Sequence, residues 1–417
     1  MPRPPRSCAL LVVATFTLLG GCRDHFGARE ETLASSSASL SGTSDGTSDA
    51  TASVGSAPAA SSSAVAVAST TSSAPTPPSA PPTYAGSLRV LTDGTVLAIR
   101  GSMLVRIAAD ASVTELVPVT SGYVDAMHVS GDERHLLLIV SPWTAGDTAA
   151  VVIGLNAPHG VVPFKGVSVQ GGAINHDGSR VALGQFIGFG VYDASTGTPI
   201  CTSQDAGIFD GDFLPSLGRF KDVVLATRVG GHAIVDANSC EVLASDSSPT
   251  GATGASTASP DGAWVASGVD GGHHLELKRT NPFGGDRVIA RYECPEHVSP
   301  TWNHDGTVMF DTGIPNNRLS AFDPKTGRRL SLMRLPKEVL ATAMFEDGRG
   351  GVALYGDRVE VLNAVTRKTT CKAALKPPNV EVFGVAVSRD RKLVFVSLGG
   401  EVAAFDAATC AEQWRVK

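Results

Sequence analysis

An aspartate turn followed by a short run of β-branched residues recurs about every 42 residues, and this period limits the folds open to the chain. In its fullest form the turn is Asp-Gly. The eight copies, spaced 39 to 45 residues apart, are centred on Asp93, Asp132, Asp177, Asp222, Asp261, Asp305, Asp347 and Asp390. A repeat of this length built from strands is typical of a β-propeller, in which each repeat forms one blade. The sequence therefore predicts an all-β propeller of eight blades, with seven as the alternative.

A second turn marker follows later in each repeat, where a strand ends in Asp or Asn before small residues. The copies are Val191–Gly197, Ala321–Gly327 and Ala404–Cys410, weaker ones that start at Ile234 and Val361, and Asn156–Gly160, displaced by an insertion around residues 141–147. An aspartate side chain can cap the turn that follows it, and glycine supplies a positive φ. Because two markers divide each repeat into four segments, we expect four-stranded antiparallel blades.

The N-terminus has the features of an export signal. Arg3 and Arg6 precede the apolar stretch Ala9–Leu19, which is too short to span a bilayer. The stretch ends in Leu19-Gly20-Gly21-Cys22, which resembles a bacterial lipobox. The resemblance implies a signal peptide at 1–21, acyl chains on Cys22 and, because Arg23 follows the cysteine, passage to the outer membrane. The alternative is an ordinary secretory signal with an incidental cysteine.

Two further regions follow the signal. Residues 22–83 are dominated by Ser, Ala, Thr and Pro, and such a segment cannot bury enough apolar surface to fold, so we expect a disordered tether. Residues 84–417 remain for the propeller. The chain has a net charge of −6 and its propeller region has no Lys/Arg run, which argues against a nucleic-acid partner.

The last repeat carries the motif of a known family. Residues Ala404–Trp414 match Ala-x-Asp-x-x-Thr-Gly-x-x-x-Trp except at the glycine, which is Cys410. This is similar to the tryptophan-docking motif of quinoprotein-like eight-bladed propellers. The Asp-Gly turns, such as Ser259–Gly262, resemble those of WD40-like repeats without their Trp-Asp dipeptide. The layout of anchor, tether and propeller is similar to that of the lipoprotein subunit of the outer-membrane β-barrel assembly machinery. Propellers host many functions, so the resemblance implies the fold and little chemistry.

The same resemblance implies two disulfides. In the quinoprotein-like family, the tryptophan of one blade packs against the glycine turn of the next. Cys201 and Cys371 occupy the tryptophan position of blades 3 and 7, and Cys240 and Cys410 occupy the glycine position of blades 4 and 8. The resemblance thus implies the pairs Cys201–Cys240 and Cys371–Cys410, which an exported protein can form. Cys294 is left without a partner and is expected to be a buried apolar residue.

Catalytic motifs are absent from the propeller sequence: it contains no Cys-x-x-Cys, Gly-x-Ser-x-Gly, Walker loop or His-Glu-x-x-His. His176 and His304 fall in Asn-His-Asp-Gly sequences at the repeated turn and are predicted to be turn residues. We assign no catalytic, metal or cofactor residue. The candidates for lining the central channel, on predicted innermost strands, are Asp125, His128, Asp210 and Asp212.

These features favour a non-enzymatic lipoprotein of the bacterial cell envelope, anchored in the outer membrane. Its propeller would be a scaffold that binds other envelope proteins or a ligand. The alternative is a propeller enzyme, either a quinone-dependent dehydrogenase or a hydrolase. A quinone enzyme of the resembled family would carry two adjacent cysteines, and this chain has none.

The repeat boundaries also predict how the ring closes. The first blade starts near Ser87 and the eighth ends with residues 411–417. No strand is then left over for exchange between the termini, so closure depends on contacts between the first and last blades. We expect this seam to be a weak point, because an open propeller exposes unpaired strand edges.

Overall fold

The computed structural model describes residues 88–119, 123–141, 149–164, 169–185, 188–204, 208–217, 220–228, 231–247, 256–269, 274–279, 288–293, 300–303, 305–311, 318–336, 339–376 and 382–417. The chain divides into two units, Met1–Ser79 and Ala80–Lys417, and the described residues belong to the second. The predictions for the signal peptide, Cys22, the tether and Cys294 lie outside the described residues.

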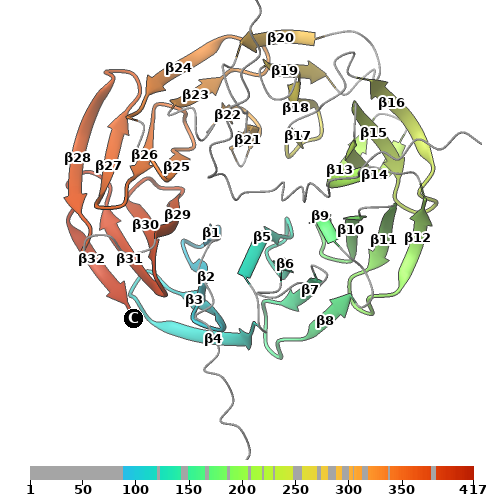
Figure 1. The fold of residues 1–417 in the computed structure, drawn as a ribbon, viewed down its shortest axis with the longest axis horizontal. Coiled ribbons are helices and arrows are strands. Elements are labelled where there is room, and N and C mark those ends of the chain that lie inside the picture. Colours follow the sequence, from blue (N-terminus) through green and yellow to red (C-terminus); the bar gives the residue numbers. More distant parts are fainter. Residues whose placement is uncertain are drawn as a thin grey trace, which may run out of the picture. The chain divides into compact units, whose positions relative to one another are not determined.

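The described residues form eight antiparallel sheets of four strands, and each sheet uses four strands that are consecutive in the chain. Figure 1 shows the sheets following one another around a ring, with the first strand of each sheet innermost and the fourth outermost. The prediction of an eight-bladed propeller is confirmed. No strand of the described residues crosses into another blade, so blade 1 and blade 8 are each complete.

The strand bounds give each blade its residues. Blades 1 to 4 comprise β1 (Leu88–Val90), β2 (Val96–Arg100), β3 (Met103–Ile107), β4 (Val113–Pro118); β5 (Tyr123–Val129), β6 (His135–Ser141), β7 (Ala149–Gly154), β8 (Val161–Phe164); β9 (Val169–Ile174), β10 (Arg180–Gln185), β11 (Phe189–Asp193), β12 (Pro199–Ser203); β13 (Ile208–Leu217), β14 (Phe220–Arg228), β15 (Gly231–Asp236) and β16 (Val242–Ser247). Blades 5 to 8 comprise β17 (Ser256–Ala258), β18 (Trp264–Val269), β19 (His274–Arg279), β20 (Val288–Glu293); β21 (Pro300–Trp302), β22 (Met309–Asp311), β23 (Arg318–Phe322), β24 (Arg329–Arg334); β25 (Ala341–Met344), β26 (Gly350–Leu354), β27 (Arg358–Asn363), β28 (Lys368–Ala374); β29 (Val382–Val387), β30 (Leu393–Leu398), β31 (Glu401–Asp406) and β32 (Glu412–Val416).

The repeated aspartate caps the hairpin between the first and second strands in seven blades. Its carboxylate accepts the amide N–H two residues later, at 3.0 Å from Asp177 to Ser179 and 3.0 Å from Asp305 to Thr307. The same bond is made by Asp93, Asp132, Asp261, Asp347 and Asp390. The residue after the aspartate has a positive φ, for example 71° at Gly178, which glycine adopts at no steric cost.

The predicted marker in blade 4 is wrong. Asp222 lies inside β14, because β13 ends at Leu217 and β14 already begins at Phe220. The carbonyl of Asp222 accepts a hydrogen bond from the amide N–H of Ala237. In blades 3, 7 and 8 the equivalent bond is accepted by the residue that lies two positions after the marker aspartate. The marker position in blade 4 is therefore Phe220. A two-residue hairpin replaces the usual five-residue turn there, and so an aspartate cap is not needed.

The second marker caps the hairpin between the third and fourth strands, as predicted. Asp193 accepts the amide N–H groups of Ser195 and Thr196, both at 2.9 Å. Asp236, Asn363 and Asp406 each accept two amide N–H groups in the same way. Local hydrogen bonding of short polar side chains thus sets both turns at one end of the ring.

The hydrophobic core is divided among the blade interfaces. Alternate residues of a strand face the two neighbouring blades, and the described residues form eight buried clusters, one for each interface. The second strands are the most buried; the side chains of β2 from Val96 to Ile99 are inaccessible to solvent. The seam between blades 8 and 1 has a cluster of its own, which includes Leu88, Phe395 and Val416. Burial between flat sheets therefore closes the ring without strand exchange.

Candidate functional site

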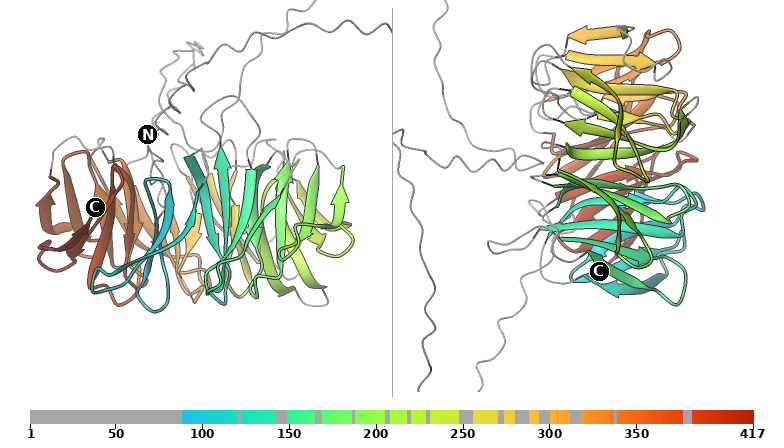
Figure 2. Two further views of the ribbon diagram at one scale, coloured as in Figure 1. Left: turned by 90° about the horizontal axis from the view of Figure 1, so that it is seen from below. Right: turned by 90° about the vertical axis from the view of Figure 1, so that its right-hand side faces the viewer.

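The two ends of the ring differ in how regular their connections are. Connections between first and second strands have five residues in six of the eight blades, whereas those between second and third strands range from two to seven. The view of the ring from the side shows the strands running between these two ends (Figure 2). Connections of varied length on a rigid scaffold are where binding residues concentrate. We call the end with the varied connections the variable end; the opposite, capped turns form the turn end.

Asp125 and His128 lie on β5, the innermost strand of blade 2, where the sequence places them. The pairing with β6 shifts register between Val124 and Ala126, so Asp125 is the extra residue of a β-bulge. Bulges redirect a side chain, and the carboxylate of Asp125 accepts a hydrogen bond from the Ser141 hydroxyl at the end of β6. Both Asp125 and Ser141 are half-buried at the variable end.

Asp212 links two blades. Its carboxylate accepts the amide N–H of Ala258, on the innermost strand of blade 5, at 2.9 Å. Burial raises the pKa of Asp212 above its ordinary value, against the lowering effect of this hydrogen bond. The backbone of Asp210 pairs with that of Thr227, but its side chain lies outside the described part. The structure does not bring the blade 2 and blade 4 candidates together into one site.

Asp212 belongs to a set of side chains that cap innermost strands. An innermost strand has one edge without a neighbouring strand, and its polar groups need other partners. The guanidinium of Arg89 in blade 1 donates to the Met127 carbonyl in blade 2 at 2.8 Å. The indole of Trp302 in blade 6 donates to the Thr257 carbonyl in blade 5 at 3.3 Å. The hydrogen bond to Ala258 gives Asp212, a channel candidate on β13, a structural role of the same kind.

A buried polar layer lies between blades 4 and 5, and the sequence analysis did not identify it. His232 Nε2 and Ser256 Oγ are 2.6 Å apart. In blade 5, the carboxylate of Glu276 lies 3.1 Å from the Lys278 amine and 3.6 Å from the Arg291 guanidinium. The side chains of His232 and Glu276 are both buried. The signal in the sequence is the strand His274–Arg279, in which polar residues alternate with Leu275 and Leu277.

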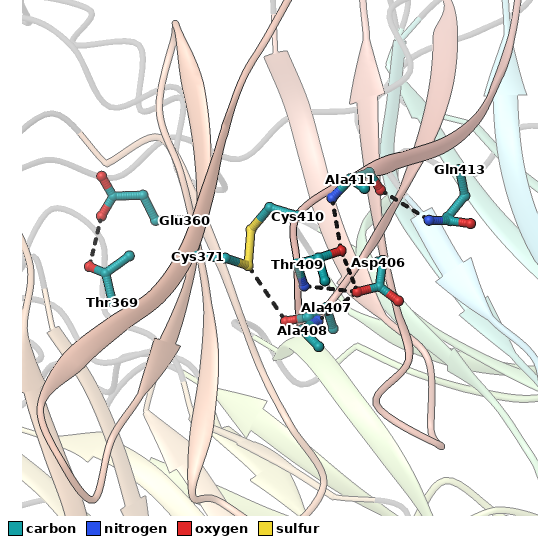
Figure 3. Close-up of a disulfide and its surroundings, with 10 residues drawn as sticks. All are labelled: Glu360, Thr369, Cys371, Asp406, Ala407, Ala408, Thr409, Cys410, Ala411 and Gln413. Atoms are coloured by element: carbon teal, nitrogen blue, oxygen red, sulfur yellow. Dashed lines mark hydrogen bonds between the residues drawn. A yellow bond between two sulfur atoms is a disulfide. The ribbon is translucent and has the colours of Figure 1, made fainter.

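Both predicted disulfides are present. Cys201–Cys240 joins blades 3 and 4, and Cys371–Cys410 joins blades 7 and 8; each pair has its Cα atoms 5.6 Å apart. Figure 3 shows Cys410 at the turn before β32 and Cys371 on β28 of the neighbouring blade. Cys240 and Cys410 both have φ of 57°, the conformation that glycine adopts at this position in blades 3 and 6. The cysteine bond therefore replaces the docking contact as predicted.

A tryptophan makes the corresponding contact at the seam. Trp414 of blade 8 packs in one cluster with Ala111 of blade 1, and its ring centroid is 5.9 Å from that of Phe395. Ala111 has φ of 67° and occupies the glycine position of the second turn. Trp414 and Ala111 thus pack against the same cluster at the seam, at the positions where the resembled motif has tryptophan and glycine.

Charged residues replace the turn glycine in blades 2 and 8 and reach neighbouring blades. Glu133, with φ of 56°, accepts the amide N–H of Thr92 in blade 1 at 2.9 Å and lies 3.4 Å from the Arg389 guanidinium in blade 8. Arg391, with φ of 60°, lies 2.8 Å from the Asp347 carboxylate in blade 7. These residues form a polar belt across the turn end from blade 7 to blade 2.

Two searches among the described residues were negative. No group of three or more His, Cys, Asp or Glu side chains is placed to hold a metal ion. The described segments contain no helix with the length and apolar character needed to cross a bilayer. His176 lies in the β9–β10 turn as predicted, and His304 falls outside the described residues.

Comparison with known proteins supports the fold. No protein-family model matches the sequence, and no curated protein sequence matches it. The structure is similar to the C-terminal WD40 domain of Sif2, with a TM-score of 0.57 and 12% identity over 74% of this chain and 91% of that one. It is also similar to the dihydro-heme d1 dehydrogenase NirN in complex with DHE, with a TM-score of 0.61 and 15% identity over 79% and 72% of the two chains. At these identities the similarity establishes a WD40-like β-propeller fold and carries no function.

Proposed function

We propose that this protein is a lipid-anchored scaffold of the bacterial cell envelope, whose propeller binds other envelope proteins through its variable end. The observation that carries the proposal is the contrast between the turns of first and second strands, which have five residues in six blades, and the connections of two to seven residues between second and third strands at the opposite end. A ring with an interface core at every blade boundary holds the strands that flank those connections in fixed positions. Such a surface supports specific recognition without bound cofactors.

Site-specific photo-crosslinking in cells tests which end binds. A crosslinking residue at Ser102 or Gly356, in connections of the variable end, is expected to capture the same partner. Matched positions at the turn end, Ser195 and Ala408, lie on exposed capped turns and are expected to capture none. Equal capture from both ends, or capture from the turn end alone, would contradict the assignment.

The anchor is tested separately. The apolar stretch that ends at Cys22 supports acylation of this cysteine, and one acyl chain alone would hold the protein only marginally. Cells grown with a tagged fatty acid are expected to label the wild-type chain and not Cys22→Ser. An unlabelled wild-type chain would show that the N-terminus is an ordinary secretory signal.

The competing enzyme hypothesis has its own test. The purified protein is expected to give no holoenzyme spectrum and no dye-linked alcohol oxidation after incubation with pyrroloquinoline quinone and calcium. Stoichiometric binding of that cofactor would favour a quinone-dependent dehydrogenase over a scaffold. The Asp125→Asn variant then decides whether the carboxylate at the bulge of β5 takes part.

A further inference from the structure

Basic residues are concentrated in blades 6 and 7. Residues 300–376, which span these two blades, contain twelve Lys or Arg and eight Asp or Glu, a net charge of +4, whereas the whole chain has −6. The turns between third and fourth strands contain no Lys or Arg in blades 1, 2, 3, 4 and 8. In blades 6 and 7 the same turns and the strand starts that follow them carry Lys325, Arg328, Arg329, Arg367 and Lys368.

Exposed apolar side chains lie among these cations. Leu330 on β24 is 42% exposed, and Val365 in the turn after β27 is 66% exposed, the highest value of any described large apolar residue. We define the basic turn cluster as Arg328, Arg329, Leu330, Val365, Arg367 and Lys368, all exposed at the turn end of two adjacent blades. Cations around protruding apolar side chains are the composition of a surface that binds anionic membranes.

Arg329 of the cluster lies over the rings of Tyr292 and Phe322, while its other three cations have no acidic partner among the described residues. Arg328, Arg367 and Lys368 form no ion pair with a carboxylate of the described residues. The turn in blade 7 is capped by the neutral Asn363, where blade 6 uses Asp323. Lys325 is omitted from the cluster because the adjacent Asp323 carboxylate offsets its charge.

Arg367 provides a second, independent observation. It has φ of 56° and occupies the turn position where blade 6 has Gly327 with φ of 67°. Glu133 and Arg391 tolerate the same unfavourable conformation, but they bind residues of neighbouring blades. Arg367 makes no such contact with any described residue, so its side chain is available to a ligand outside the chain.

We infer that the basic turn cluster of blades 6 and 7 binds the anionic headgroups of a phospholipid bilayer. The inference rests on the proposed function, which places the propeller beside a membrane. An acidic protein is the less suitable partner, because exposed apolar side chains, Leu330 and Val365, lie among the cations, and an interfacial lipid layer accepts both kinds of side chain. The headgroup phosphates pair with the guanidinium and ammonium groups, and Leu330 and Val365 enter the interfacial layer.

Vesicle sedimentation with the full chain carrying Cys22→Ser tests this without any acyl chain. Binding to phosphatidylglycerol vesicles is expected at low ionic strength and is expected to weaken as salt rises. Pure phosphatidylcholine vesicles control for the apolar N-terminal stretch. The triple variant Arg328→Glu, Arg367→Glu, Lys368→Glu is expected to bind about a hundredfold more weakly or worse, since each of the three cations lost contributes roughly 1 kcal/mol near an anionic surface.

Matched variants distinguish the effect of the basic turn cluster on vesicle binding from the effect of net charge. Arg134→Glu, Lys392→Glu and Lys417→Glu together change the net charge equally at exposed positions elsewhere and are expected to bind as the parent does. Arg367→Gly removes one cation and relieves its backbone conformation, so it is expected to fold at least as stably and bind less. No binding to phosphatidylglycerol, or equal losses in both triple variants, would overturn the inference. Fatty-acid labelling at Cys22 is unaffected by either result, so the anchor and the cluster are judged separately.

Discussion

The interface between blades 7 and 8 and the interface between blades 4 and 5 occupy equivalent places in the ring but are built differently. Between blades 7 and 8, thirteen described residues form an apolar cluster, and a disulfide spans the outer strands. Between blades 4 and 5, the described apolar cluster has five buried residues. His232, Ser267 and Glu276 are buried at that boundary instead. Because buried polar side chains stabilise an interface less than apolar ones do, we expect the ring to loosen first between blades 4 and 5, where these polar residues lie.

This comparison changes the expectation for the seam. The sequence predicts a weak point between blades 8 and 1. The structure gives that interface nine buried residues and Trp414, and Glu133 of blade 2 spans the seam by binding Thr92 of blade 1 and Arg389 of blade 8. Among the described residues, the seam is therefore better packed than the boundary of blades 4 and 5. The chain compensates for the absence of strand exchange with side-chain contacts at both edges of the seam.

The largest effect should come from removing the disulfide of blade 8. The double variant Cys371→Ser, Cys410→Ser removes a covalent bond between residues with a sequence separation of 39. It is expected to lower the free energy of unfolding by roughly 3 to 4 kcal/mol. Denaturant unfolding measures this loss. In the control, Cys371→Ser with Cys410→Gly, glycine relieves the positive φ at residue 410 and should recover about 1 kcal/mol. Equal stability of the serine pair and the wild type would mean that the bond does not hold blades 7 and 8 together.

A smaller effect should separate two serines at the boundary of blades 4 and 5. Ser256 makes the hydrogen bond to His232, so Ser256→Ala is expected to cost about 1 kcal/mol. The buried Ser267 hydroxyl has no hydrogen-bond partner among the described residues, so Ser267→Ala is expected to leave stability unchanged or to raise it. Thermal unfolding of the two variants checks the difference. Equal losses would show that both hydroxyls are satisfied in the native ring.

The smallest effect should come from acid. Hydrogen bonds from Ser388 to Asp390 and from Thr409 to Asp406 lower the pKa values of these carboxyls below their ordinary value of 3.8. Their contribution to stability is present above that value and is lost as the pH falls through the depressed pKa values, because the unfolded state takes up protons at a higher pH than the folded state does. Acid should therefore weaken the blade 8 turns. The free energy of unfolding is measured between pH 5 and pH 2, and it is expected to fall less steeply with acid in the double variant Asp390→Asn, Asp406→Asn than in the wild type. The same pH dependence in both proteins would show that other carboxyls cause the loss.

The sequence determines the fold well because the repeated turns are local. An aspartate followed by glycine forms its cap within three residues, so the blade count could be predicted from spacing alone. Asp222 was misplaced because a two-residue hairpin needs no cap and an unrelated aspartate happened to lie nearby. The disulfides could be predicted because they replaced a recognisable contact.

The candidate site was harder to predict because its contacts join distant parts of the chain. The link from Asp212 to Ala258 and the pair of His232 with Ser256 both cross a blade boundary. Which residues face each other across such a boundary depends on the tilt and register of two separate sheets. Spacing within one repeat carries no information about either.

Hydrogen exchange measured by mass spectrometry tests the central claim, that the ring is held unevenly. The amides of β30 and β31 in blade 8 pair within a disulfide-linked, apolar interface and are expected to exchange most slowly. The amides of β18 and β19 in blade 5 pair equally well within their sheet but adjoin the polar layer, and they are expected to exchange faster. Both predictions apply to the oxidised protein, and reduction should narrow the difference. Uniform protection around the ring, or slower exchange in blade 5 than in blade 8, would contradict the account.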